Sequence, residues 1–159
     1  DSYGSRGLGD VYKRQPKHPF AYRLAVADFN NDGKDDIFAG SMGLQYRNED
    51  YSKNYISPYP DLLLLSNSSG KLEESSRNID DQNNGNGKQC NFSHDASIGD
   101  FDNDNDIDIF ACNILLVNDG TGKFSFEEYL GASLQINYGN PMSSLLVDLN
   151  NDSFDDLVF

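Results

Sequence analysis

Residues 28–36 read DFNNDGKDD, and two later segments repeat the pattern: DFDNDNDID at residues 100–108 and DLNNDSFDD at residues 148–156. In each segment an oxygen-bearing side chain stands at positions one, three, five and nine, and the backbone carbonyl of position seven is available. Oxygen donors of this kind form the shell that a hard divalent cation such as calcium requires. The pattern therefore predicts a calcium-binding loop that occurs three times.

The residues around each acidic segment have an apolar period of two. Leu24 and Val26 alternate with alanines before the first segment, and Ile98 precedes the second. This period is typical of β-strands. Residues 61–75 (DLLLLSNSSGKLEES) and 114–128 (ILLVNDGTGKFSFEE) each read as two strands joined by a tight turn, because Asn and Gly tolerate the backbone that a hairpin needs.

Each repeat unit is therefore expected to contain four strands, with the acidic loop joining the first to the second and a hairpin joining the third to the fourth. Four antiparallel strands per repeat are typical of a propeller blade. We predict an all-β fold, an incomplete β-propeller of about two and a half four-stranded antiparallel blades. The expected boundaries are residues 16–92 for blade 1, 93–142 for blade 2 and 143–159 for the truncated start of blade 3.

Two insertions account for the uneven spacing of the acidic segments. Residues 43–60 are rich in tyrosine and residues 79–89 are rich in Asn and Gly, and we expect both to be surface loops, the second one mobile. The tyrosine rings of the first insertion could stack on sugars or anchor a protein partner, or they could simply pack the loop against its own blade. These residues are Tyr46, Tyr51, Tyr55 and Tyr59.

Two other interpretations of the acidic segments are weaker. An EF-hand needs a bidentate Glu at position twelve, where this chain has Ala39, Ala111 and Phe159. A purely polar turn, capped by its own Asp and Asn side chains, would not require carboxylates at fixed alternate positions in three copies. Their mutual repulsion would be costly without a cation.

The three loops are expected to differ in strain at position six, where a sharp bend favours a positive φ. Gly33, Asn105 and Ser153 occupy this position in chain order, which is an order of rising backbone strain. The second loop also has a carboxylate, Asp102, at position three. We therefore predict that the third site binds calcium most weakly.

The charge of the chain restricts its partners. The net charge is -14, and 13 of the 26 acidic residues lie in the three segments. No cluster of Lys or Arg opposes this field, so we expect no nucleic-acid binding. No apolar run approaches the roughly 18 residues that span a bilayer, so we expect no membrane insertion of this fragment.

Both ends of the chain have unusual features. Residues 1–15 are basic and glycine-rich, and DVYKRQ at residues 10–15 can be encoded by DNA that resembles a transposase adapter used in sequencing libraries. We therefore expect residues 1–15 to be non-native and the chain to be a fragment, since it stops where the third unit would begin its second strand. Cys90 and Cys112 could form a bridge or remain two buried thiols.

The segments AVADFNNDGKDDIFAG (25–40) and LLLLSNSSGKLEES (62–75), with ASIGDFDNDNDIDIF (96–110) and LLVNDGTGKFSF (115–126), resemble the FG-GAP or VCBS-type repeat of bacterial secreted and surface proteins. This repeat is related to the propeller of the integrin α-subunit, and the resemblance covers residues 21–159. It implies a calcium-binding β-propeller, usually of about seven blades, in an extracellular or cell-surface protein. Adhesion, carbohydrate or protein contact and scaffolding are the implied roles.

The resemblance also implies a set of calcium ligands by motif position. The Phe-Gly and Gly-Ala-Pro pairs of the integrin version are absent, which argues against integrin-like ligand binding but not against the calcium site. The ligands carried over are Asp28, Asn30, Asp32, the carbonyl of Lys34 and Asp36; Asp100, Asp102, Asp104, the carbonyl of Asp106 and Asp108; and Asp148, Asn150, Asp152, the carbonyl of Phe154 and Asp156.

An enzymatic alternative is the propeller of a secreted carbohydrate-active enzyme such as a polysaccharide lyase, in which calcium would polarise a uronate carboxylate. His18 and His94, each ahead of an acidic loop, would be the candidate bases, with Lys or Tyr as alternatives. No nucleophile and base with defined roles can be assembled, and His at a strand edge is more often a packing residue. We therefore expect a binding module without catalytic residues.

Overall fold

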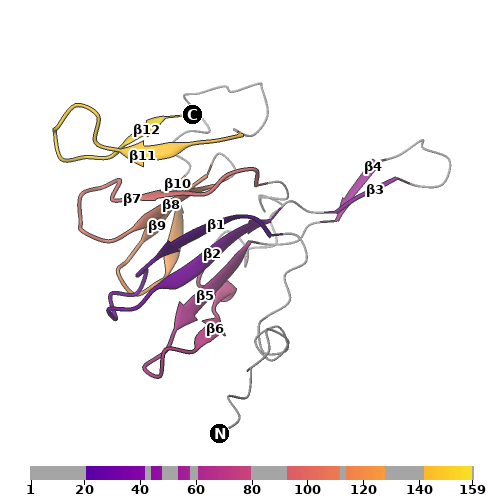
Figure 1. Cartoon of the computed structure of the whole chain (residues 1–159). Helices are drawn as coiled ribbons and strands as arrows, with labels where there is room; N and C mark the ends of the chain where they lie inside the picture. The colour runs from indigo at the N-terminus through magenta and orange to yellow at the C-terminus, as the bar shows by residue number, and fades with distance from the viewer. Residues whose placement is uncertain are drawn as a thin grey trace, which may run out of the picture.

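The structure, a computed structural model, describes residues 21–41, 44–47, 54–57, 61–79, 93–111, 114–127 and 142–158. Apart from one short 3-10 helix, every element in these ranges is a strand, which confirms the all-β prediction (Figure 1). The elements are β1 (Ala21–Ala27), β2 (Asp36–Ser41), β3 (Leu44–Arg47), β4 (Asn54–Ser57), β5 (Leu62–Ser66), β6 (Leu72–Glu74), η1 (Ser76–Asn78), β7 (Ser97–Gly99), β8 (Asp108–Ala111), β9 (Ile114–Asn118), β10 (Phe124–Glu127), β11 (Leu145–Val147) and β12 (Asp156–Val158).

The strands form two four-stranded antiparallel sheets of the same design. The first has the order β1-β2-β5-β6 and the second the order β10-β9-β8-β7. In both sheets the four strands therefore lie side by side in their order along the chain. An acidic loop joins the first strand to the second, and a tight hairpin joins the third to the fourth. The predicted blade pattern is confirmed for both units.

The third unit contributes the antiparallel pair β11–β12. Its register is the same as in the complete sheets, because the last residue before the acidic segment always pairs with the Asp at position nine. These pairs are Ala27 with Asp36, Gly99 with Asp108, and Val147 with Asp156. In Figure 1 the first sheet, the second sheet and the β11–β12 pair lie one above another, and the three acidic loops project from the same edge.

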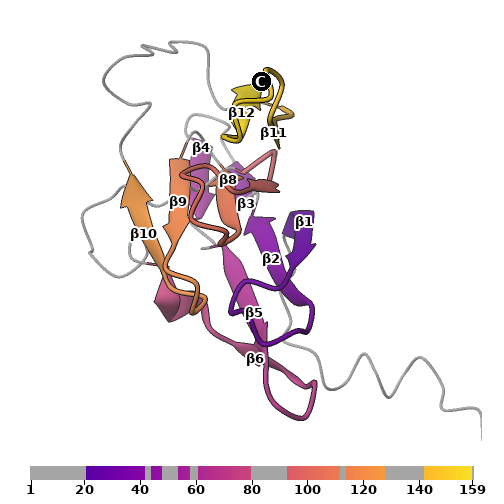
Figure 2. The same ribbon diagram turned by 90° about the vertical axis from the view of Figure 1, so that its left-hand side faces the viewer.

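Apolar side chains fill both spaces between these layers. Between the two sheets, the fully buried rings of Phe29 and Phe124 meet edge to face with centroids 5.7 Å apart, and Ile109 joins the same cluster. The next residue of β8, Phe110, packs instead with Leu146 in the space below β11 and β12. Successive strand residues point to opposite faces, so β8 is buried on both sides and contributes to both cores. Figure 2 shows β8 beside β9 in the second sheet.

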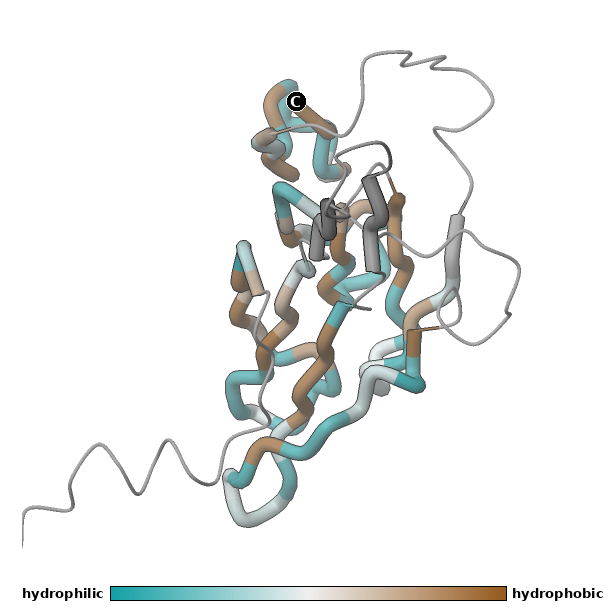
Figure 3. The backbone as a smooth tube through the Cα atoms, turned by 90° about the vertical axis from the view of Figure 1, so that its right-hand side faces the viewer, coloured by the Kyte–Doolittle hydropathy of each residue, from teal (hydrophilic) through white to brown (hydrophobic). Residues whose placement is uncertain are grey.

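The same positions of successive units face successive interfaces. Val26, Ile98 and Leu146 each stand two residues before an acidic segment. Ile98 packs against the core shared with the first sheet and Leu146 is 5% exposed in the second core, whereas Val26 is 52% exposed. On the opposite face, Ala25 is buried and Leu145, at the equivalent place in the third unit, is exposed. The second and third units therefore each pack one face against the unit before them. Figure 3 shows the hydrophobic segments following the strands.

Two loop predictions need correction. The segment 43–60 was predicted to be a surface loop, but it contains the hairpin β3–β4, which projects away from the sheets and pairs Tyr46 with Tyr55 (Figure 1). The segment 79–89 was predicted to be a mobile loop from its first residue, but Ile79 is completely buried and forms a parallel bridge with Phe124. This bridge joins the end of the first unit to β10 of the second sheet.

Several predictions concern parts of the chain outside the described residues. They are the non-native origin of residues 1–15, the mobility of residues 80–89, the bridge between Cys90 and Cys112, and the roles of His18, Tyr51 and Tyr59. In the part of the chain that is described, no helix has the length and apolar character needed to cross a bilayer.

Candidate metal centre

All three acidic loops are folded by the same hydrogen bonds to the carboxylate at position one. Its two oxygens accept the backbone N–H groups of positions five and six, which closes the loop into a tight turn around this side chain. The donors are Asp32 and Gly33 to Asp28 (3.0 and 2.7 Å), Asp104 and Asn105 to Asp100 (3.0 and 2.9 Å), and Asp152 and Ser153 to Asp148 (3.2 and 2.9 Å). The sequence repeat is thus a repeat of local structure.

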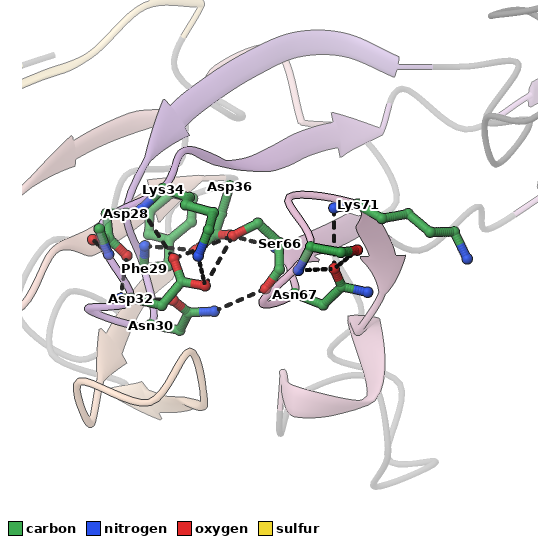
Figure 4. Close-up of polar contacts among 11 residues, drawn as sticks. Asp28, Phe29, Asn30, Asp32, Lys34, Asp36, Ser66, Asn67 and Lys71 are labelled. Atoms are coloured by element: carbon green, nitrogen blue, oxygen red, sulfur yellow. Dashed lines mark hydrogen bonds and ion pairs between the residues drawn. The ribbon is translucent and has the colours of Figure 1, made fainter.

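The Asp at position nine attaches the first and second loops to their sheets. Asp36 is completely buried, and its Oδ2 accepts the N–H of Phe29 (2.8 Å) while its Oδ1 accepts the N–H of Ser66 at the end of β5 (2.6 Å). Asp108 does the same with Phe101 (2.8 Å) and Asn118 (2.9 Å). Figure 4 shows the first loop, with Asp36 and Ser66 side by side. The sequence spacing predicts position nine only as a ligand, because one of its backbone partners lies in a distant strand.

The loops need two residues with left-handed backbone. The predicted positive φ at position six is confirmed for Gly33 (81°), Asn105 (72°) and Ser153 (75°). Position four also has a positive φ, between 56° and 62°, which was not predicted. The signal was present, because position four is Asn in all three loops and Asn is the side chain that tolerates this region best after Gly. The residues are Asn31, Asn103 and Asn151.

In the second loop, three carboxylates converge. Oxygen atoms of Asp100, Asp102 and Asp108, which are positions one, three and nine, lie within 4.8 Å of one another, and this group could hold a metal ion. Two of these carboxylates are fixed by backbone N–H groups, so the group is held in place by the fold.

The remaining predicted ligands are placed differently. The carboxylate at position five turns toward the chain that follows it, because its Oδ1 accepts the N–H of position seven at 2.9 Å in each loop. In the first loop, Asp32 also forms an ion pair with the ammonium group of Lys34 at 3.1 Å. At position three, the side-chain oxygens of Asn30 and Asn150 accept the N–H of position five (3.1 and 2.8 Å). The complete ligand sets of the three loops stay predictions.

The electrostatics of the second loop favour a cation. Burial raises the pKa of Asp108 to about 6, against two lowering hydrogen bonds from the backbone of Asn118 and Phe101, and the charges of Asp102 and Asp104 raise it further. The pKa of Asp102 is also raised, first by desolvation and then by its neighbours Asp104 and Asp100. Crowded carboxylates with raised pKa values are stabilised in their charged form by a bound cation. The donor set therefore fits a hard divalent metal.

Two family comparisons match the segments that contain these loops. Residues 20–53 match the FG-GAP repeat, and residues 100–159 match the FG-GAP-like repeat. The chain carries FG-GAP repeats. The resemblance inferred from the sequence is confirmed, and the two four-stranded sheets with the β11–β12 pair are arranged as in FG-GAP propeller blades. No curated protein matches the sequence of the chain.

His94, a candidate base in the enzymatic alternative, lies ahead of β7, at the opposite end of that strand from the second FG-GAP loop. Its ring meets the ring of Tyr22 edge to face at 5.5 Å, and its backbone carbonyl accepts a hydrogen bond from Nε of Arg23 at 3.4 Å. These contacts join the start of the second blade to β1.

Proposed function

We propose that the FG-GAP blades are a calcium-binding scaffold of an extracellular protein that contacts carbohydrate or protein. The observation that carries the proposal is the convergence of Asp100, Asp102 and Asp108 within 4.8 Å. Calcium is preferred over magnesium because it accepts irregular oxygen shells at 2.3–2.6 Å, whereas magnesium demands near-ideal octahedral geometry. FG-GAP loops of this composition would be occupied in calcium-rich surroundings, which is why we place the protein outside the cell.

The metal would act on folding. When bound, calcium supplies concentrated positive charge beside carboxylates that otherwise repel one another. The protein residues do the rest: Asp100 closes the loop over the N–H groups of positions five and six, and Asp108 ties it to β9. Metal binding would thereby stabilise the connection between the first and third strands of a blade.

Thermal melting of the chain in EDTA and in 5 mM calcium tests this proposal. With dissociation constants of about 0.1 to 1 mM, each occupied site adds about 1 to 2 kcal/mol, and we expect the melting temperature to rise by about 5 °C or more. Magnesium should raise it less. An unchanged melting temperature, together with no retained calcium by elemental analysis, would contradict the proposal.

Asp102→Ala is the sharpest variant for this test. Asp102 is exposed and belongs to the metal group, but its carboxylate does not staple the loop to the sheet as Asp108 does. The calcium-free melting temperature should therefore stay the same or rise slightly, because a repulsive charge is removed, while the calcium-induced rise should shrink. Glu73→Ala, an exposed acidic change on β6, is the matched control and should leave the calcium response intact.

The recognition part of the proposal is supported by the β3–β4 hairpin. It projects from the first blade (Figure 1), and Tyr46 and Tyr55 are register partners within it. Segments that extend from a rigid scaffold often carry binding function. Binding to an array of extracellular glycans, measured with the parent chain and with a Tyr46→Ser and Tyr55→Ser double variant, tests this part. Equal binding by the two would exclude the hairpin as the recognition element.

A further inference from the structure

The acidic loops of neighbouring blades touch each other. Asp155, at position eight of the third loop, accepts a hydrogen bond on Oδ2 from the backbone N–H of Asp100 at 2.9 Å, and its own N–H approaches the carbonyl of Asp100 at 3.4 Å. Asp100 is position one of the second loop and a member of the metal group. A residue of one loop therefore fixes the backbone of a candidate ligand in another.

The second blade has room for this contact because of Gly99. A Cβ atom at Gly99 would overlap the Asp155 carboxylate and would lie 2.7 Å from Cβ of Leu146. The equivalent residues of the other two units are Ala27 and Val147, which have side chains. Gly99 is not among the glycines with a positive φ, so space and not backbone freedom accounts for the glycine. The space beside Gly99 is thus filled by the Asp155 carboxylate.

The first and second loops are joined as well, by different residues. Nδ2 of Asn31, at position four of the first loop, donates to Oδ1 of Asp106 at 2.7 Å and to the carbonyl of Gly120 at 3.3 Å. Nδ2 of Asn118, whose backbone N–H binds Asp108, donates to the carbonyl of Phe29 at 2.8 Å. Both junctions therefore connect loop to loop.

We propose that the metal sites of successive blades are energetically coupled, and that Asp155 is the positioning residue through which occupancy of the third loop raises the affinity of the second. This inference rests on the proposed calcium binding. A metal that orders the third loop holds Asp155 against Asp100, so the second loop reaches its binding geometry with less ordering left to do. Linkage is reciprocal, so calcium in the second loop must favour calcium in the third by the same factor.

Calcium titration of the full chain, followed by amide resonances, can measure each loop separately. The amides of Gly33, Asn105 and Ser153 are suitable reporters, because each donates to the position-one carboxylate of its own loop. Asp152→Asn removes a predicted ligand of the third loop and keeps an oxygen for the N–H of Phe154. We expect this variant to weaken calcium binding at the Asn105 reporter about fivefold, at the lower end of typical coupling between sites.

The variants of Asp155 identify the route of the coupling. Asp155→Ala should weaken binding at the second loop by a similar factor, and adding Asp152→Asn to it should cause little further loss there. Asp155→Asn keeps an oxygen acceptor for the N–H of Asp100 without the charge, so it should retain most of the coupling. Asp35→Ala is the matched control, because Asp35 is the exposed position-eight residue of the first loop. It should leave the second loop unchanged.

The outcomes separate this inference from the proposed function. If no reporter amide responds to calcium, both fail. If all three loops titrate but Asp152→Asn leaves the affinity of the second loop unchanged, calcium binding stands and the coupling is wrong. If Asp155→Asn behaves like Asp155→Ala, a charge effect replaces the positioning role. Should Asp155→Ala fail to give a dispersed spectrum, Asp152→Asn and Asp155→Asn alone decide the result.

Discussion

The stapling role of Asp36 gives a strong prediction for the calcium-free protein. Asp36→Ala removes the acceptor for two buried N–H groups, those of Phe29 and Ser66, which its carboxylate binds at 2.8 and 2.6 Å. Each buried donor left without a partner costs about 1 to 3 kcal/mol, so the variant should lose about 4 kcal/mol of unfolding free energy. That is a large part of the stability of a small domain, which is typically about 5 to 15 kcal/mol.

The control for Asp36→Ala is the same change in the third loop. Asp156 is less buried, and its carboxylate accepts the N–H of the exposed Leu149 at 3.1 Å. Asp156→Ala should therefore cost about 1 kcal/mol or less. Urea denaturation in EDTA, followed by circular dichroism, measures both losses without a contribution from metal. Equal losses in the two variants would refute the argument that Asp36 stabilises the blade through its buried N–H partners.

Three further predictions follow from the loops and the interfaces. Ser153→Gly removes the strain of a left-handed backbone at a residue with a side chain and should raise the calcium affinity of the third loop about fivefold. Gly33→Ser introduces that strain at a position where a Cβ meets open space, so it should lower the calcium affinity of the first loop about fivefold. Amide titrations measure both affinities. Because burial raises the pKa of Asp108 to about 6, above its usual 3.8, the folded calcium-free protein keeps a proton that the unfolded chain has lost. Its unfolding free energy should therefore fall as the pH rises from about 4 to 6. The calcium-induced rise in melting temperature should be smaller below pH 6, because protonated Asp108 binds calcium less well. Thermal melts at pH 5 and pH 7.5, with and without calcium, measure this difference. Finally, Leu146→Ser should cost about 3 kcal/mol by urea denaturation, whereas Val26→Ser at the equivalent exposed position should cost less than about 0.5 kcal/mol.

The blade pattern could be predicted from the sequence because the signals that specify it are local. The alternation around Val26 gives a strand, and the turn after β5 is closed by Asn67, whose side-chain oxygen accepts the N–H groups of Ser69 and Lys71 at 3.0 and 3.1 Å. Ile79 was assigned wrongly because its burial depends on Phe124 in the next blade. The sequence around Ile79 contains no local pattern that predicts its contact with Phe124.

The candidate metal site was predictable to the same extent. The spacing of the aspartates identified the loops, and the strand context placed them between the first and second strands. The sequence could not predict which carboxylates bind backbone N–H groups. Asp36 accepts the N–H of Ser66, and Asp155 accepts the N–H of Asp100, only because the fold brings distant segments together. Sequence spacing located these side chains, and tertiary contacts determined which of them hold the backbone.

The alternating faces of the blades affect how such a chain can change in length. At both described junctions the apolar residue two positions before the acidic segment packs against the preceding unit, as Ile98 and Leu146 show. A duplicated unit would bury the same apolar positions against its neighbours, but its loop contacts would need new residues, because one junction uses Asp155 and Asp100 and the other uses Asn31 and Asp106. The apolar contacts are therefore shared between junctions, and the polar contacts between loops distinguish one junction from the next and specify the order of stacking.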